Sequence, residues 1–182
     1  MSSTILNAIN MLNKDKHTVG NLNNWNKSMV NEGAIVADEK IDNFSIVELG
    51  FDKDGERTCS LLKTETEKGY LIASVEDYMD EYGEGLGNFF NVKGERARIV
   101  VLEPRVTRFD VSNFKPDNAD LATKPIKNGQ KVHWDITNKT FLVSNGDSDN
   151  AGYATAGNQF MVVNANSVIL DGKQTIRLEV VK

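Results

Sequence analysis

The chain has few of the residues on which disulfide and metal chemistry depend. Cys59 is its one cysteine, and His17 and His133 are its two histidines. One cysteine forms no intrachain disulfide, which is compatible with a reducing cytoplasm. A structural zinc site takes about four thiolate or imidazole ligands, so a site within a single chain is excluded. We therefore predict no metal centre and interpret Cys59, in a strand-like run, as a small packing residue.

Recognisable catalytic motifs are also missing. The glycines of Gly83–Gly87 lack the Lys-Ser/Thr pair and the strand–loop–helix order that cradle phosphates. No Gly-x-Ser-x-Gly turn marks a hydrolase nucleophile. Acidic residues are common, but nothing singles out two of them as a catalytic pair. We predict a protein that is not an enzyme and has no cofactor.

Positive charge is not in excess, and long apolar runs are missing. The net charge is −5 and the pI is about 5.1, which argues against a general polyanion binder. Apolar runs of a few residues fall far short of the ~20 that span a bilayer, and the N-terminus lacks the pattern of a secretory signal. We expect a soluble protein without nucleic-acid or membrane partners. Four arginines near Phe109 are interleaved with three acids, which dilutes the positive field and favours cross-strand ion pairs as the use of the arginines. The arginines are Arg96, Arg98, Arg105 and Arg108, and the acids are Glu95, Glu103 and Asp110.

The sequence is rich in short alternating runs. In Gln174–Lys182, the apolar Ile176, Leu178 and Val180 alternate with polar residues, the pattern of a half-buried antiparallel strand. Similar runs end at Asn/Gly/Asp turns, of which Asp52–Gly55 and Asp171–Gly172 are typical hairpin signals. We predict strands at residues 34–37, 44–51, 58–63, 70–73, 88–92, 96–102, 106–114, 131–136, 140–143, 159–164, 168–170 and 175–181. Residues 88–92 and 96–102 are predicted to form a hairpin that turns at Lys93-Gly94.

The N-terminal region has a different texture. Ile5, Leu6, Ile9 and Leu12 recur at helical spacing, and His17–Asn31 is asparagine-rich and irregular. This arm either packs on its own domain or reaches a neighbouring subunit. Because exposed apolar side chains need a cover, we assign partner binding to Leu12, Trp25 and Met29.

One further helix is predicted after Ser74, where Ser with Asp77 resembles a capping box. It carries the acidic segment Glu76–Glu84, either a solvated helix face or a divalent-cation site. Asp52 with Asp54, and Asp147 with Asp149, mimic the start of a calcium loop but lack its distal acid, so we interpret the first pair as turn chemistry and decline the second as a calcium site.

The expected fold is mainly β, with two small antiparallel β-barrel or sandwich modules and an N-terminal arm that contains a short helix. The predicted division is residues 1–31 for the arm, 32–115 for a middle β-rich domain with one short helix, and 128–182 for a C-terminal barrel or sandwich. The boundary falls in the polar connection Pro116–Asn128, which holds two of the chain's three prolines.

Three segments, Lys68–Met79, Phe89–Val100 and Arg108–Phe114, resemble capsid-associated structural proteins of tailed bacteriophages. The C-terminal block, which ends in Ile176–Val180, is similar in style to β-rich head decoration proteins of such phages. The likeness covers about residues 69–182 and lies in order and spacing, without a sharp motif.

This resemblance implies a head decoration or cement protein of the virion. Such a protein is made in the host cytoplasm, binds the major capsid protein on the outside of the assembled shell, and forms a homo-oligomer, with a trimer favoured. A role in the tail or baseplate is a close alternative. A different class is a β-barrel module that binds single-stranded nucleic acid or glycan through Trp134, Phe141, Tyr153 and Phe160, although large aromatics of this kind favour the core.

Overall fold

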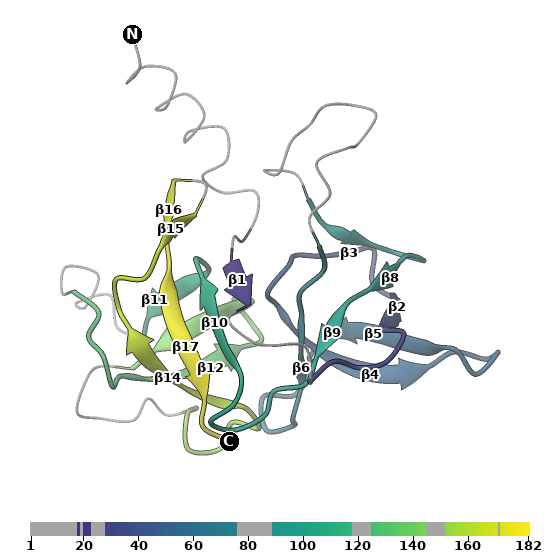
Figure 1. The fold of residues 1–182 in the computed structure, drawn as a ribbon. Helices are drawn as coiled ribbons and strands as arrows, with labels where there is room; N and C mark the ends of the chain where they lie inside the picture. The colour runs from purple at the N-terminus through teal and green to yellow at the C-terminus, as the bar shows by residue number, and fades with distance from the viewer. Residues whose placement is uncertain are drawn as a thin grey trace, which may run out of the picture.

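The computed structural model describes residues 18, 20–22, 28–75, 89–117, 125–144, 152–170 and 172–182. In these ranges the regular structure is all β, which confirms the mainly-β class. Two large sheets lie side by side, one built mostly from the second half of the chain and one from the first (Figure 1). The predicted N-terminal helix and the helix after Ser74 lie outside the described ranges, and within those ranges no helix is long and apolar enough to cross a membrane.

The larger sheet has seven strands in the order β1-β10-β17-β14-β12-β13-β11. All neighbouring strands are antiparallel except β11 and β13, which are parallel. Ile176, Leu178 and Val180 are at most 1% exposed, as their alternation predicts. The bounds are β1 Gly20–Leu22, β10 Arg108–Val111, β11 Phe114–Pro116, β12 Lys131–Asp135, β13 Thr140–Val143, β14 Gln159–Asn164 and β17 Ile176–Val180.

The second large sheet has six strands in the order β8-β2-β5-β4-β6-β9, with one parallel pair, β2 and β5. Its strands are β2 Ala34–Val36, β4 Ile46–Phe51, β5 Arg57–Leu61, β6 Tyr70–Ile72, β8 Arg96–Ala97 and β9 Ile99–Val100. Two-stranded sheets add β3 Lys40–Ile41 with β7 Asn91–Val92, and β15 Ile169–Leu170 with β16 Lys173–Gln174.

Both large sheets curl so that their ends approach each other. In the six-stranded sheet, β8 and β9 are the two end strands, yet only Arg98 separates them in the chain. In the seven-stranded sheet, β10 and β11 lie near opposite ends, and only Ser112 and Asn113 separate them. Among the described strands neither sheet is closed by pairing, so the predicted barrels are curled, open sheets.

The two sheets share the main hydrophobic core. Its buried members include Ile46, Leu71 and Val100 from the six-stranded sheet, and Phe109 and Phe160 from the seven-stranded sheet. A second, smaller core is formed within the six-stranded sheet. Because shared burial makes the stability of each sheet depend on the other, we expect the two sheets to unfold as one unit.

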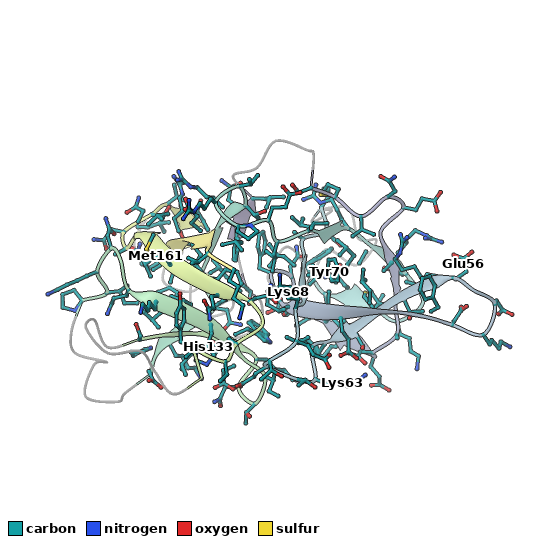
Figure 2. The ribbon with its side chains drawn as sticks, turned by 90° about the horizontal axis from the view of Figure 1, so that it is seen from below. Glu56, Lys63, Lys68, Tyr70, His133 and Met161 are labelled. Carbon is teal, nitrogen blue, oxygen red and sulfur yellow. The ribbon has the colours of Figure 1, made fainter. Side chains whose placement is uncertain are left out.

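Backbone contacts fix the junction between the sheets. The buried Gly69 N–H donates to Asn158 Oδ1 at 2.6 Å, and Gly157 N–H donates to Glu65 O at 2.7 Å. A Cβ on Gly157 would lie 1.9 Å from the carbonyl oxygen of Glu67, so only glycine fits this approach. Figure 2 shows neighbouring Lys68 and Tyr70 between the two groups of strands.

The predicted hairpin at Lys93-Gly94 is wrong in its pairing. The turn is present, with Gly94 at φ 86°, but β7 pairs with β3 and β8 pairs with β2. Gly94 N–H donates to Val36 O, and Val36 N–H donates to Glu95 O. Glu95 N–H closes the turn on Val92 O, but the residues on either side of the turn pair with β2 and β3 and not with each other.

The predicted domain ranges stay a prediction, and the position of β10 shows how the two sheets share the described strands. Strand pairing passes from the six-stranded to the seven-stranded sheet between β9 and β10, earlier than the connection Pro116–Asn128. β10 belongs to the seven-stranded sheet because its apolar side chains are buried there. Phe109 and Val111 are fully buried in the shared core and lie opposite Leu178 and Ile176 of β17.

Candidate functional site

The reactive side chains of the described residues do not gather into a metal site. No group of three or more His, Cys, Asp or Glu in these residues could hold a metal ion. Cys59 is 1% exposed, and burial, with the negative charge of Asp38, raises the pKa of its thiol to about 11. The thiol is therefore protonated at neutral pH, which fits the packing role predicted for it.

The aromatic residues of the predicted ligand-binding alternative lie in the core. Trp134, Phe141, Tyr153 and Phe160 are between 0% and 7% exposed. The Phe141 and Phe160 rings lie 5.4 Å apart with an interplanar angle of 86°, and the Trp134 and Phe141 rings lie 5.0 Å apart. Edge-to-face clusters of this kind stabilise a core, and buried rings offer no face on which a base or sugar could stack. The core interpretation is confirmed.

His133 is also a buried residue. It lies on β12 beside Trp134 and is 3% exposed. Gly152 packs against its ring, because a Cβ on this glycine would lie 2.6 Å from His133 Nε2. His133 is therefore a packing residue of the fold, and His17 lies outside the described residues.

Arg108 forms a cross-strand ion pair of the predicted kind, and Arg96 pairs with an acid that lies just before β5. Arg108 of β10 lies opposite Glu179 of β17 and contacts its carboxylate at 2.5 Å. Arg96 contacts Glu56 at 2.8 Å, and Arg98 donates instead to the carbonyl oxygen of Ala73. These groups are bound to neighbouring parts of the chain and do not line a basic groove.

The acidic turn at Asp52 binds its own backbone. Asp52 Oδ1 accepts hydrogen bonds from the N–H groups of Asp54 and Glu56, each at 2.9 Å. Gly55 adopts φ 84°, as the hairpin signal predicts. The turn interpretation is confirmed; the segment Glu76–Glu84 and the pair Asp147 and Asp149 lie outside the described residues.

A half-open depression of about 220 Å³ lies on the six-stranded sheet. Its wall mixes apolar, polar and charged groups without a convergent set: Val36, Ser74, Val75, Phe89, Phe90, Asn91, Glu95, Arg96 and Ala97. The described chain ends at Val75 and resumes at Phe89 beside it. We assign no ligand to this depression.

Of the predicted partner-binding residues, Met29 is described and Leu12 and Trp25 are not. Met29 forms a bridge with Val100 and packs, half-buried, against the shared core. On either side, Val30 N–H donates to Ile99 O and Val101 N–H donates to Ser28 O. This part of the arm therefore covers the edge of β9 in its own molecule, and binding of a partner by the three residues stays a prediction.

The β15–β16 hairpin projects beyond the seven-stranded sheet (Figure 1), and two apolar residues in it are exposed. Val168 is 42% exposed and Ile169 is 68% exposed. At its base, Ser167 N–H donates to Thr175 O at 3.2 Å, and the hydroxyl of the fully buried Thr175 donates to Val168 O at 2.5 Å. The sequence predicted the turn, but it gave no sign that these apolar residues face solvent.

A buried ion pair holds this hairpin in place. Asp110 is 0% exposed and accepts two hydrogen bonds from Arg177, at 2.9 and 3.1 Å. The Ser167 hydroxyl donates to the same carboxylate at 2.6 Å. The hydrogen bond to Asp110 raises the pKa of Arg177 above its usual value, so the guanidinium stays charged. The hairpin is thus a rigidly mounted apolar projection, which suits binding of another protein.

The β4–β5 hairpin is a second projection. It extends past the rest of the six-stranded sheet toward Glu56 (Figure 2). Phe51, at the end of β4, is 73% exposed. Leu49 is half-buried against the smaller core, and a Glu48–Lys63 ion pair at 2.6 Å lies nearby. The side of β4 that faces away from β5, over residues Glu48–Phe51, is called the β4 edge below.

Comparison with known proteins places the chain in a phage-derived group. Residues 13–181 match the model of the YonC prophage protein family. The SPbeta prophage-derived uncharacterized protein YonC of Bacillus subtilis (strain 168) is 44% identical over 169 residues, which cover 91% of this chain and 92% of that protein. No solved structure matches. A phage origin is confirmed, and the chain belongs to the YonC prophage protein family.

Proposed function

We propose that this protein is a non-enzymatic structural component of a phage particle, which binds the outside of the assembled capsid shell and stabilises it. Its origin in a prophage family supports a role in the phage life cycle. The observation that carries the proposal is the β15–β16 hairpin, where exposed Val168 and Ile169 stand on a base fixed by buried Asp110. In this proposal the partner is the major capsid protein, and the protein resides on the virion surface.

The energetics suit a repeated surface. Burying a residue such as Val or Ile contributes about 1.5–3 kcal/mol, too little for a tight complex from one hairpin. A shell repeats the same site many times, so an oligomer that engages several sites gains avidity without further contacts in each. A rigid mount helps because little conformational entropy is lost on docking.

Shells assembled without this protein provide the test. Purified protein is mixed with them, the shells are sedimented, and the bound fraction is measured over a range of protein concentrations. We expect saturable binding that Ile169→Asp reduces at least tenfold. Val106→Asp is the matched control, because Val106 is also exposed, at 52%, but does not belong to this hairpin; it should bind as the unmodified protein does.

Two results would contradict the proposal. One is unmodified protein that stays in the supernatant at every concentration. The other is equal loss of binding in both variants. Immunogold labelling of complete particles separates the head from the tail: gold confined to the tail would replace shell binding with the tail or baseplate alternative.

A further inference from the structure

The β4 edge has backbone groups that no other described strand uses. Asp52 N–H donates to Glu56 O, and Leu62 N–H donates to Ile46 O, so residues 46 and 52 direct their backbone groups at β5. Because this direction alternates along a strand, Leu49 and Phe51 direct theirs away from β5. β6 takes up only Ile46 and Val47. Among the described residues, Leu49–Phe51 therefore pair along β5 alone.

We propose that two copies of this chain pair through their β4 edges, antiparallel and about a twofold axis at Gly50. In this register Leu49 of each copy lies opposite Phe51 of the other, and each such residue pair exchanges both backbone hydrogen bonds. Aromatic–aliphatic pairs of this kind stabilise antiparallel strands. The pairing covers Phe51, which is 73% exposed in the single chain.

The surrounding charges permit this register. Glu48 of one copy approaches Asp52 of the other, but both carboxylates are already compensated. Lys63 binds Glu48 at 2.6 Å and holds its pKa below the usual value, and Asp52 accepts hydrogen bonds from its own turn. Beyond Asp52 the second copy turns back toward its own β5. It therefore does not reach the position opposite Val47 of the first copy, which Tyr70 of β6 already occupies.

Self-pairing fits this edge better than pairing with an unrelated strand. The apolar face is its own complement, because Leu49 and Phe51 exchange places across the axis, and Gly50 meets Gly50 where two strands approach most closely. A C2 contact of this kind is closed, so it forms pairs and not fibres. The edge is short, so we expect a weak dimer whose population depends on concentration.

Mass and cross-linking measure this pairing in solution. In sedimentation velocity over about 1 μM to 1 mM, we expect the mass to rise from 20.2 kDa toward twice that value. Phe51→Pro removes the outward N–H and the ring but no hydrogen bond to β5, and it should weaken dimerisation at least tenfold. Phe51→Thr keeps the backbone and should weaken it less. Ile169→Thr on the other hairpin should leave it unchanged.

A cysteine at the axis gives a sharper test. In Gly50→Cys the two new thiols would face each other across a close strand pair, with Cα atoms about 4.5 Å apart, within disulfide range. The native Cys59 is buried and does not compete. The new Cβ meets Thr58 Oγ1 at 3.3 Å, a contact that a small side chain tolerates. We expect mild oxidation to give a covalent dimer at least tenfold faster than in Lys53→Cys on the exposed turn.

The inference is independent of shell binding, which the Ile169→Asp variant tests. It would be overturned by a mass of 20.2 kDa at the highest concentration, or by a trimer that Phe51→Pro leaves intact. Equal oxidation rates for the two cysteine variants would also overturn it. If Phe51→Pro proved unfolded by circular dichroism, Phe51→Thr and Gly50→Cys would still decide the matter.

Discussion

Replacing Gly157 by alanine should destabilise the whole molecule, because this residue lies at the junction of the two sheets. The new Cβ would lie 1.9 Å from the carbonyl oxygen of Glu67 and 2.1 Å from its carbon. An ordinary contact needs about 3.4 Å, so the backbone segments must separate, and overpacking of this kind costs about 1–3 kcal/mol or more. The separation also weakens the hydrogen bonds Gly157 N–H to Glu65 O and Gly69 N–H to Asn158 Oδ1.

Together these effects predict a loss of about 3–5 kcal/mol, since each hydrogen bond contributes about 1 kcal/mol. For a chain of this size that corresponds to a fall in Tm of about 6–20 °C. Urea denaturation followed by circular dichroism gives the free energy of unfolding, and calorimetry gives the Tm. Gly94→Ala is the control: nothing lies within 4 Å of its Cβ, so its cost is the φ 86° strain, about 1–2 kcal/mol.

Cooperativity is part of the same reasoning. Because Ile46 and Leu71 share a core with Phe109 and Phe160, the unmodified protein should unfold in a single transition. Two separate transitions in the unmodified protein would refute the shared core as the source of stability. If the free energy of unfolding of Gly157→Ala lay within about 1 kcal/mol of the unmodified protein, the worth of one hydrogen bond, the close approach of the backbone segments would be refuted.

Three further predictions concern the core and the ionisable groups. Phe160→Ala should cost about 3–5 kcal/mol of stability in urea denaturation, because the ring is fully buried against Phe109 and Phe141; a loss below 1 kcal/mol would contradict this packing. Cys59, with a pKa of about 11, is about one part in a thousand thiolate at pH 8, so a thiol reagent should label the native protein far more slowly than the urea-unfolded protein; equal rates would contradict burial. Burial raises the pKa of Asp135, but hydrogen bonds from Asn138 and Thr137 outweigh it and lower the pKa, so this group stabilises the fold above its unfolded pKa near 4 and the stabilisation is lost as pH falls through the folded value. The Tm difference between the unmodified protein and Asp135→Asn should therefore shrink between pH 6 and pH 3, and a constant difference would count against it.

Strands with strong local signals could be predicted from the sequence. Thr140–Val143 and Gln159–Asn164 match their predicted bounds, because polar turns bracket short apolar runs. The tight turns at Gly55 and Gly172 adopt the positive φ that glycine permits. These features depend on residues close together in the chain, which is the range that a pattern reports.

Features set by distant partners could not be predicted. β1, β3 and β11 are two or three residues long and are strands because a remote strand offers them an edge. The parallel pairs β2–β5 and β11–β13 leave no local pattern. The sequence placed Asp110 among neighbouring arginines, but its carboxylate binds Arg177, which is distant in the sequence.

The two candidate binding surfaces could not be predicted either, because the exposure of their residues also depends on distant parts of the chain. Phe51 belongs to an alternating run, and its exposure follows from how far the β4–β5 hairpin extends beyond its neighbours. Val168 and Ile169 form an apolar run typical of a strand, and the orientation of their hairpin is set by the Asp110 network. A pattern predicts that such residues form strands, but it does not say which of them the rest of the fold leaves uncovered.

The position of β17 has a consequence for how the molecule is made. This strand lies inside the seven-stranded sheet, between β10 and β14, although it is synthesised after every other described strand. During translation, β10 and β14 emerge from the ribosome with no strand between them, and their inner edges stay open until Ile176–Val180 arrive. Nascent chains in which β17 has not yet paired are therefore the species that a host chaperone would have to shield.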